Sequence, residues 1–471
     1  MRIETGRLDR RDFLTLATGG MAALAGGCAA WRGHSLIPLP KAAKRRSLKV
    51  GVIGAQGQGE RYWRTICGGG DRLVALCDVD ERSLSAARKT LLDRYRVENL
   101  HVFKDFRVMF DAHPDLDALF IATPDHGHAA QALWAIERKI PVYVAPPVVR
   151  TLGELKHLLK CSDRNGVPLW QGSSISATPL FRQCVELLRG GIIGDIAEIY
   201  AWTAQPLWPQ GYPSPSGSDP VPQGLDWDLW LGPSPYRPFK RSVYHRFNWR
   251  GWEAFGTGTL GSCGGDLLQL PFQARNLHAP TRIENLTPPR RGSKVSYPVS
   301  SHLRFHLSGG GLIGRGPTLH WYDGGEQPDI PQMELVRRSF RGRLPSEGVL
   351  IWGERGFWLM VQATGKRHYL YLNSDAKFRA IQEHPACNLL PQTLPSLSLE
   401  QTFLEAVRSG AITGMRCNIN LAMMETLLTG CVAQLEAGPV YWRPLWSHFS
   451  RGVLNRTYLN QPVRPGWIPP L

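Results

Sequence analysis

Paired cysteines are the first thing that this sequence lacks. Its nine cysteines include no CxxC pair and no other paired spacing, and structural zinc sites and disulfide frameworks depend on such spacing. Several of them lie in apolar segments, where a free cysteine packs as a small buried hydrophobe. We therefore expect neither a metal site nor a disulfide framework.

Long hydrophobic runs, internal repeats and nucleic-acid-binding modules are also missing. The mildly apolar stretch from Leu14 to Ala25 is too short to span a bilayer stably. The formal net charge of +16 does not indicate a nucleic-acid partner, because much of it is local. The basic cluster from Lys41 to Lys49 is typical of a solvated linker, or of one that rests on anionic lipid.

What remains is the composition of a soluble globular protein. The 471 residues are 43% hydrophobic and 20% charged, which is ordinary for that class. This length predicts two domains, or one domain with a large second lobe.

An export signal is predicted over residues 1–30. Arg10 and Arg11 precede Asp-Phe-Leu and a run of small residues, which resembles a twin-arginine signal. The alternative is an N-terminal helix that frays. Two processing routes stay open: acylation of Cys28 as in a lipoprotein, which lacks the usual leucine three residues earlier, or cleavage near Ala30. Either route predicts a periplasmic or membrane-anchored protein.

The stretch from Leu48 to Trp63 predicts a nucleotide site. A short apolar run enters a turn with Gly54, Gly57 and Gly59, and an amphipathic segment follows. A strand that ends in such a turn and opens a helix is typical of dinucleotide binding, with pyrophosphate on free backbone N–H groups. Asp78 ends the next apolar run, where a carboxylate can accept hydrogen bonds from ribose hydroxyls. The alternative is an ordinary strand–helix turn.

Strand and helix patterns alternate from Leu48 onward, which predicts a parallel doubly wound sheet. Strands are expected at 48–54, 72–78, 100–103, 116–123, 141–145 and 167–171, with helices at 59–67, 81–95, 106–113, 127–138 and 152–164. After Ser173 the pattern changes to a Pro/Gly/Ser-rich loop at 206–224, antiparallel strands, and closing helices at 399–408 and 420–436. The predicted fold class is α/β, with a basic linker (31–47), a Rossmann domain (48–172) and a C-terminal α/β domain (173–471).

Tryptophan is concentrated in one part of the second domain. Six of the sixteen tryptophans (202, 208, 227, 230, 249 and 252) fall in one short window. A tryptophan face suits the apolar C–H face of a sugar, and its N–H is a polar handle. Packing of a long loop against the sheet explains the cluster equally well.

Taken together, these features resemble the glucose–fructose oxidoreductase/inositol dehydrogenase/MocA (Gfo/Idh/MocA) family, in particular its exported twin-arginine branch. The resemblance rests on Cys77–Glu81, Ala122–His128, Tyr143–Pro147, Trp208–Gly211, Leu225–Pro233, Trp249–Trp252, Gly256–Gly261 and Trp321–Gly325. The family implies a Rossmann domain and a C-terminal domain whose open, mostly antiparallel sheet often forms the interface of a homo-oligomer. It also implies NAD(P)-dependent hydride chemistry on sugars or cyclitols.

The resemblance further implies roles for single residues. Cofactor contacts are expected at Gly54, Gln56, Gly57, Gly59, Asp78, Thr123, Pro124, His128 and Pro147, and substrate contacts at Gln171, Trp208, Trp249, Arg250 and Trp252. His128 aligns with the family's histidine near the nicotinamide, although a packing role fits it equally well. Asp125 is interpreted as the cap of a helix that begins near Gly127. No metal or nucleic acid is expected, and membrane contact only through the signal or a lipidated Cys28.

The chain departs from the family pattern where the chemistry lies. Family enzymes carry Glu-Lys-Pro after the fifth strand, and the lysine position here is Pro146. The family's Asp and His, four residues apart, correspond to Ser262 and Asp266, and a carboxylate is a weaker base than imidazole unless burial raises its pKa. Gln56 replaces the glycine at the closest approach to pyrophosphate. The family's Asn-Arg pair reads Ala204-Gln205.

Three functions remain in competition. The first is a binding protein, or pseudoenzyme, that holds a sugar- or cyclitol-like ligand and a weakly bound NAD or NADP. The second is an active NAD(P)-dependent sugar or cyclitol dehydrogenase that uses Asp266 or His128. The third is a glycosidase that uses bound NAD for transient oxidation and elimination. We favour the first, because losing both lysine and imidazole removes acid–base help worth about 10²–10⁴-fold in rate.

Overall fold

The computed structural model describes residues 46–173, 175, 178–287, 294–308, 316–362, 365–387, 397–410 and 417–469. The expectations about the export signal, Cys28 and nearly all of the basic linker fall outside these residues. Within them, no helix combines the length and the apolar character needed to cross a membrane.

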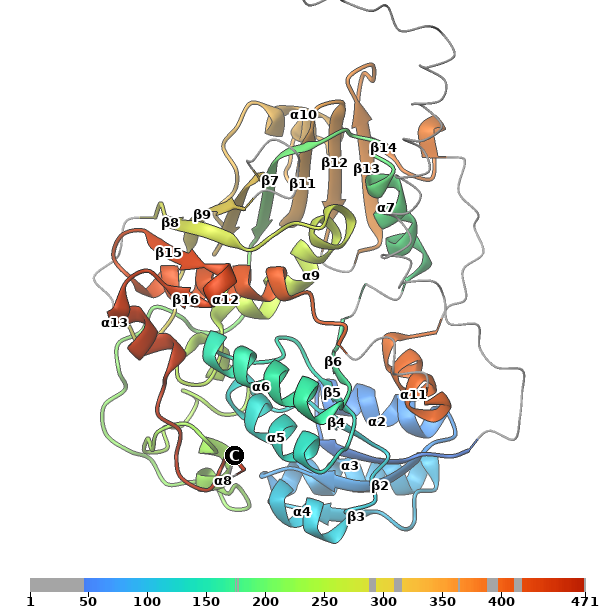
Figure 1. Ribbon diagram of the computed structural model, residues 1–471, viewed down its shortest axis with the longest axis vertical. Coiled ribbons are helices and arrows are strands. Elements are labelled where there is room, and N and C mark those ends of the chain that lie inside the picture. Colours follow the sequence, from blue (N-terminus) through green and yellow to red (C-terminus); the bar gives the residue numbers. More distant parts are fainter. Residues whose placement is uncertain are drawn as a thin grey trace, which may run out of the picture.

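The first sheet lies within residues 46–173 and has six parallel strands in the order β3-β2-β1-β4-β5-β6. The strands are β1 (Lys49–Ile53), β2 (Arg72–Cys77), β3 (His101–Phe103), β4 (Ala118–Ile121), β5 (Val142–Val144) and β6 (Leu169–Gln171). The helices are α2 (Gln58–Gly68), α3 (Glu81–Tyr95), α4 (Phe106–Ala112), α5 (Asp125–Glu137) and α6 (Leu152–Asn165). They cover both faces of the sheet (Figure 1). The predicted doubly wound sheet is confirmed.

Polar side chains fix where three of these helices begin. Asp80 accepts a hydrogen bond from the second residue of α3, and Asp105 does the same for α4. Thr151 and Glu154 form a reciprocal capping box at the start of α6. Such caps satisfy backbone N–H groups that have no partner inside the helix.

A second sheet forms the other half of the molecule. In the described residues it has ten strands, in the order β14-β13-β12-β11-β7-β10-β9-β8-β15-β16. They are β7 (Ile196–Thr203), β8 (Pro280–Asn285), β9 (Ser301–Leu307), β10 (Thr318–Asp323), β11 (Glu347–Gly353), β12 (Gly356–Val361), β13 (Arg367–Leu372), β14 (Arg379–Ala380), β15 (Val440–Arg443) and β16 (His448–Phe449). Strands β7 and β10 pair in parallel, and the other described pairs are antiparallel. The expected open, mostly antiparallel sheet is confirmed.

Helices lie on both faces of this second sheet. Between it and the first sheet lie α9 (Gly258–Arg275) and α12 (Leu421–Leu435), with α7 (Pro179–Arg189) beside α9 (Figure 1). The opposite face carries α10 (Gln332–Ser339), whose Met333 and Val336 are buried in one cluster with Tyr200 and Trp202 of β7.

The sequence pattern does not predict helix α9. Its glycines and Pro271 lower local helix propensity. Tertiary packing explains them, because a Cβ at Gly264 would lie 2.5 Å from Leu427 Cδ2 of α12. A Cβ at Gly430 of α12 would lie 2.4 Å from Leu260 Cδ2 of α9. Small residues on both helices therefore permit their close contact.

The tryptophan-rich connection between β7 and α9 has a core of its own. It contains α8 (Trp227–Leu231) and the short helix η1 (Asn248–Gly251). Trp227 and Trp230 stack with ring centroids 4.6 Å apart. Trp249, Trp252, Phe239, Tyr244 and Phe255 complete this buried cluster. These rings pack the long loop.

A helix from late in the chain completes the core of the first sheet. Helix α11 (Leu399–Ser409) packs on α2, far from the second sheet (Figure 1). The Phe403 ring lies 5.5 Å from Phe120, 5.4 Å from Tyr143 and 5.6 Å from Trp170, measured between centroids. At its end, Arg408 Nη2 donates to both carboxylate oxygens of Asp71, at 2.6 and 2.7 Å.

We expect Phe403→Ala to lower the free energy of unfolding by about 3–5 kcal/mol, because it leaves a cavity among three aromatic rings. Urea unfolding of the mature protein measures this loss. The matched control is Leu92→Ala on α3, where the side chain is 45% exposed and the change should stay within about 0.5 kcal/mol. Equal losses in both variants would show that α11 adds nothing to the core.

Candidate functional site

The turn between β1 and α2 has the geometry of a phosphate-binding loop. Gly54 has φ +96°, and a Cβ there would lie 2.6 Å from the Ala122 carbonyl oxygen. A Cβ at Gly59 would lie 1.8 Å from the Gly54 oxygen, so strand and helix can approach this closely only with glycine. No side chain caps α2, and its N-cap residue Gly57 faces open space. The free helix end therefore fits a pyrophosphate.

Asp78 is held in place beside this turn. Its Oδ2 accepts a hydrogen bond from Ala55 N at 2.8 Å, and its Oδ1 accepts one from Asp80 N at 3.0 Å. Burial raises the pKa of this carboxyl, against the opposing effect of these two hydrogen bonds. A carboxylate has about four lone-pair sites, so it can also accept from ribose hydroxyls. The residues present therefore fit a dinucleotide, with half-buried Gln56 as the bulkiest group in the turn.

A segment of the second domain covers the chain just after Asp78. Glu81 N donates to Gly224 O at 2.9 Å, and Asp226 N donates to Val79 O at 3.0 Å. Farther along the same loop, His245 Nε2 lies 3.7 Å from the Asp80 carboxylate. The loop therefore lies over the end of β2, where the adenosine half of a dinucleotide would bind.

Asp125 is a buried carboxyl where the two domains meet. Helix α5 begins at Asp125 itself and no side chain caps it, so the interpretation of Asp125 as a cap is wrong. The residue is 2% exposed, and its Oδ2 accepts a hydrogen bond from Thr257 Oγ1 at 2.8 Å. Thr257 is the N-cap residue of α9, so the N-terminal ends of α5 and α9 meet at this carboxyl. Burial raises its pKa to about 7, although Thr257 and Arg250 act in the opposite direction.

His128 is held between two segments of backbone. Its Nδ1 lies 2.8 Å from the Pro147 oxygen and its Nε2 lies 2.7 Å from the Thr123 oxygen. His126 is held similarly, with Nε2 2.9 Å from the Trp230 oxygen and Nδ1 facing another backbone carbonyl. Burial lowers the pKa of each imidazole to about 4. Both rings join chain segments, and no ring nitrogen is left without a carbonyl partner.

The chain after β5 supplies backbone rather than ionisable side chains. Ala145 N donates to Ile121 O at 2.8 Å, and a cis peptide bond joins Pro146 to Pro147. At the end of β6, Gln171 Oε1 accepts a hydrogen bond from Val148 N at 3.1 Å. Gln171 therefore steadies this turn from the neighbouring strand.

Helix α9 presents the other candidate groups. Ser262 and Asp266 lie four residues apart and thus on one face of the helix. The Ser262 hydroxyl is buried with no hydrogen-bond partner, and Asp266 is half-buried. Cys263 lies between them, and burial, with a smaller effect from Asp266, raises its thiol pKa to about 12.

Arg250 links the aromatic loop to this region. Its guanidinium carbon lies 4.2 Å from the Trp249 ring centroid, 4.6 Å from Phe247 and 5.7 Å from Trp208. Burial lowers its pKa, and the nearby Asp125 acts in the opposite direction. Trp208 and Trp249 therefore lie beside Arg250. Trp252 lies in the loop's own core, and its Nε1 donates to a backbone carbonyl there.

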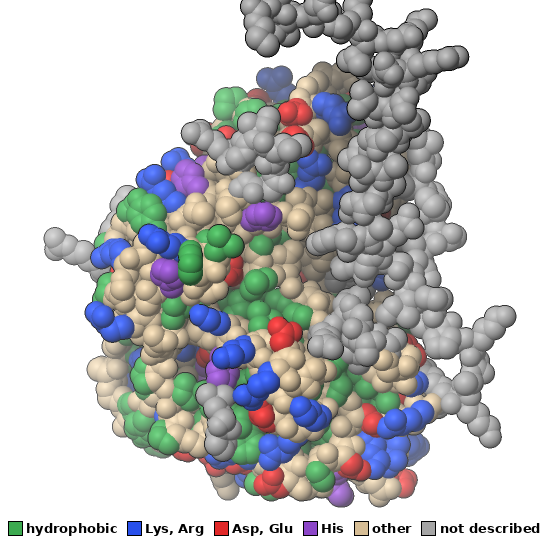
Figure 2. All heavy atoms as spheres, viewed as in Figure 1, with side chains coloured by type: hydrophobic (Ala, Val, Ile, Leu, Met, Phe, Trp, Pro, Cys, Tyr) green, Lys and Arg blue, Asp and Glu red, His purple; other side chains and the backbone are tan. Residues whose placement is uncertain are grey.

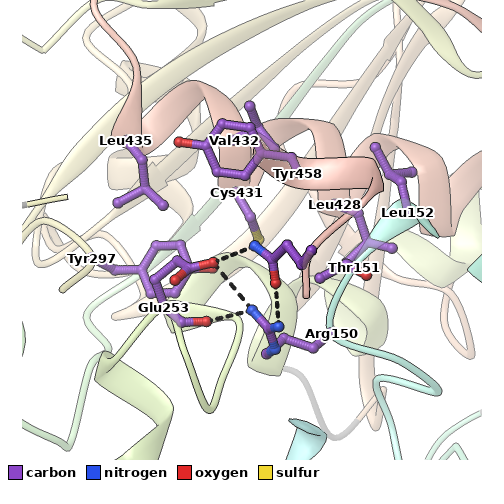
Figure 3. A pocket seen from close by; sticks show the side chains of 11 residues that line it. Arg150, Thr151, Leu152, Glu253, Tyr297, Leu428, Cys431, Val432, Leu435 and Tyr458 are labelled. Carbon is purple, nitrogen blue, oxygen red and sulfur yellow. Dashed lines mark hydrogen bonds and ion pairs between the residues drawn. The ribbon is translucent and has the colours of Figure 1, made fainter. Parts of the chain in front are cut away.

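A small cavity lies between the domains, close to this junction. It is lined by Arg150, Glu253, Tyr297, Cys431, Tyr458 and Gln461, among others (Figure 3). Arg150 Nη1 donates to the backbone carbonyl oxygen of Glu253 at 2.7 Å and to its side-chain Oε1 at 3.1 Å. Gln461 Nε2 also donates to this Oε1. The cavity has a volume of about 20 Å³, which is enough for one water molecule but too small for a sugar.

Two features of the site have no local signal in the sequence. The contact between Asp125 and Thr257 joins residues 132 positions apart, and the contact between Arg150 and Glu253 joins residues 103 positions apart. Within the ranges that the structure describes, no three His, Cys, Asp or Glu side chains gather in a way that could hold a metal.

Family models match three separate segments of the chain. Residues 48–173 match the model of an oxidoreductase family with an NAD-binding Rossmann fold, named GFO_IDH_MocA. Residues 205–293 match the C-terminal α/β domain of the same oxidoreductases. Residues 1–32 match the twin-arginine signal model of the ubiquinol–cytochrome c reductase Fe-S subunit, which supports export by that route.

Curated relatives are similar over about a third of the chain. A glycosyl hydrolase family 109 protein of Shewanella amazonensis is 31% identical over 172 residues, which are 33% of this chain and 37% of the relative. Inositol 2-dehydrogenase 1 of Saccharopolyspora erythraea is 28% identical over 152 residues, 32% of this chain and 43% of the relative. The chain thus spans less than half the length of these relatives.

Solved structures share the fold over most of the chain. An inositol dehydrogenase homologue from Azotobacter vinelandii, complexed with NAD⁺, aligns with 85% of this chain and 99% of its own, at TM-score 0.56 and 14% identity. An aldose–aldose oxidoreductase from Caulobacter crescentus, complexed with glycerol, aligns with 84% of this chain and 100% of its own, at TM-score 0.55 and 15% identity.

We expect Asp125→Asn to change how stability depends on pH. The folded carboxyl keeps its proton up to about pH 7, whereas an unfolded one loses it near pH 3.9, about the ordinary value. The stability that this group contributes is therefore full below about pH 4 and is lost as pH rises through about 7. Relative to wild type, the variant should gain at least about 1 kcal/mol between pH 5 and pH 8.

Urea unfolding at a series of pH values measures this difference. Asp93→Asn, on the exposed side of α3, is the matched control and should differ from wild type by a constant amount. Parallel profiles for Asp125→Asn and wild type would contradict the shifted pKa.

Proposed function

Because this chain belongs to the Gfo/Idh/MocA family of oxidoreductases, we propose that it binds NAD(P) and a sugar- or cyclitol-like ligand, with hydride transfer lost or much reduced. The observation that carries the proposal concerns the side chains that could transfer a proton: the histidine rings face backbone carbonyls, and the lysine position holds a proline. His126 and His128 lie in the first turn of α5, just after β4, and each ring nitrogen faces a backbone carbonyl. Pro146 stands where the family carries its lysine.

The dinucleotide half of the proposal rests on the turn after β1. Gly54, Gly57 and Gly59 leave the end of α2 uncapped and open, and Asp78 is fixed beside it. Solved structures of the same fold contain NAD⁺ or NADH, among them the inositol dehydrogenase homologue and levoglucosan dehydrogenase. We propose weak binding, because the Gln56 side chain stands where backbone should approach the pyrophosphate.

The proposal that hydride transfer is lost or much reduced follows from asking which group could receive the proton that the reaction releases. Oxidising a secondary alcohol removes a hydride from carbon and a proton from oxygen. NAD supplies the hydride acceptor when it is bound, and the protein must receive the proton. Asp125 and Asp266 are two carboxyls considered for this role, and Asp125 already accepts a hydrogen bond from Thr257 while buried. General acid–base help is typically worth about 10²–10⁴-fold in rate, and a site without lysine or free imidazole forgoes much of it.

Substrate contacts are proposed for Arg250 with its neighbours Trp208 and Trp249, and for Gln171 at the end of β6. Arg250 can donate to ligand hydroxyls while its plane rests on the tryptophans. Trp252 packs in the loop's own core and would act through that loop.

An active dehydrogenase is the second candidate. Half-buried Asp266 on α9, one helical turn from the buried Ser262 hydroxyl, favours it, because a carboxylate is the remaining proton acceptor on that face of the helix. A glycosidase that uses bound NAD is the third, supported by the family 109 relative. Hydrolysis of aryl glycosides by the purified protein, with no net change in NADH, would single it out.

We also propose that the mature protein works outside the cytoplasm, either free in the periplasm or held by an acylated Cys28. Palmitate labelling that disappears in Cys28→Ser would establish the anchor, and its absence would leave the soluble form. A homo-oligomer built on the open sheet is proposed as well, and light scattering on the purified protein tests it.

We expect Gln56→Gly to tighten NAD binding by roughly 1–2 kcal/mol, the size of a modest overpacking penalty. Calorimetric titration of nucleotide-free protein measures the gain. Gln58→Gly is the matched control, because Gln58 begins α2 with an exposed side chain and should bring no gain. Low-micromolar binding by wild type, unchanged in Gln56→Gly, would show that Gln56 is accommodated.

For the chemistry, we expect wild type not to reduce NAD(P) with any of a broad panel of sugars and cyclitols. The triple variant Pro146→Lys, Ser262→Asp, Asp266→His restores the family groups together and should turn over, because groups that act as a unit recover together. Pro146→Lys alone serves as the control and should remain inactive. Robust wild-type turnover that Asp266→Asn abolishes would instead establish an active enzyme with Asp266 as its base.

A further inference from the structure

The hairpin between β15 and β16 carries two large apolar side chains into solvent. A single turn of 3₁₀ helix, η4 (Pro444–Trp446), joins the strands. Leu445 is 96% exposed and Trp446 is 71% exposed. Keeping large apolar side chains exposed to water costs free energy. Two neighbouring ones at the tip of a hairpin therefore indicate that the tip contacts another surface.

The base of this hairpin is firmly packed, so the tip is held outward. Val440 and Trp442 are 1% and 2% exposed, and the Trp442 ring lies 4.9 Å from Phe449 between centroids. Asn455 exchanges two hydrogen bonds with the Phe449 backbone, at 2.8 and 2.9 Å. The tip is therefore a rigid projection of the second sheet.

The surroundings of the tip are basic. From Gly438 to the last residue the sequence contains no Asp or Glu and four arginines. Arg443, Arg451 and Arg456 of this set are exposed. Figure 2 shows blue Lys and Arg side chains among green hydrophobic ones along the side of the molecule where Figure 1 labels β15, β16 and α13 (Gly452–Leu454). Tyr441 and Val453 add exposed apolar area, at 42% and 48%.

We propose that this tip, defined by Leu445 and Trp446, docks the mature protein on an anionic membrane surface. Leu445 enters the acyl boundary, Trp446 lies at the headgroup level, and the arginines contact the lipid phosphates. A membrane fits better than a second copy of the chain. A second copy would bring a surface of the same positive net charge toward the arginines near the tip, whereas anionic headgroups match their charge and yield to the shape of the projecting pair.

The export route makes this contact available independently of any catalytic role. A protein that carries a twin-arginine signal is released at the far face of a membrane, where anionic lipid is within reach. Docking by the tip needs no acyl chain, so it works whether or not Cys28 is modified.

Co-sedimentation with vesicles tests the proposal, using exported protein with Cys28→Ser so that no acyl anchor contributes. Vesicles of phosphatidylglycerol and phosphatidylcholine should bind the protein, and pure phosphatidylcholine vesicles should bind it at least tenfold more weakly. The double variant Leu445→Ser, Trp446→Ser should lose at least tenfold in partitioning. Arg451→Gln with Arg456→Gln should weaken binding to anionic vesicles alone and reduce its salt dependence.

The control is Tyr236→Ser, which removes an exposed aromatic group (70%) from another loop and should bind as wild type does. Unchanged thermal unfolding of each variant confirms that the fold is intact. Vesicle binding that is unaffected by the tip substitutions would overturn the proposal. So would a wild type that ignores anionic vesicles but forms oligomers that the tip variant cannot form, because a second copy would then cover the tip.

Discussion

A buried contact joins the two halves of this protein at their centre, where the N-terminal ends of α5 and α9 meet at the Asp125 carboxyl. Each helix end carries positive partial charge, and the Thr257 hydroxyl from the second end donates to the acid on the first. The adjacent His126 adds a backbone hydrogen bond to Phe255. The start of α5 and the start of α9 are thus held together by a contact that also occupies an ionisable group.

The same junction explains why the surviving histidines favour a structural role. His126 and His128 lie in the first turn of α5, and their rings join it to the aromatic loop and to the turn after β5. A ligand can reach a ring nitrogen of His126 or His128 only if that nitrogen turns away from the carbonyl that it faces. The contacts that hold these two rings in place thus fix the start of α5 against the aromatic loop and the turn after β5.

Local sequence reveals the first sheet better than the site. Runs such as Leu73–Cys77 are apolar because helices cover both faces of a parallel sheet, so strands, order of elements and fold class are readable. Helix α9 cannot be read from local sequence in this way, because its glycines are explained by contact with α12, which lies more than a hundred residues later in the chain. The pairing of Asp125 with Thr257 and the packed tryptophans are equally non-local. The aligned positions Pro146, Ser262 and Asp266 are visible in sequence, but whether they bear on a ligand depends on such distant contacts.

Helix α11 has a consequence for how the molecule is made. The aromatic side chains Phe120, Tyr143 and Trp170 are synthesised early, yet Phe403, which covers them, comes from residues 399–409. The amino-terminal half therefore cannot finish folding while the ribosome is still adding the middle of the chain. A translocation route that accepts folded cargo suits this order of assembly. A route that threads the chain from its N-terminus would expose an unfinished core on the far side until the last segments had crossed.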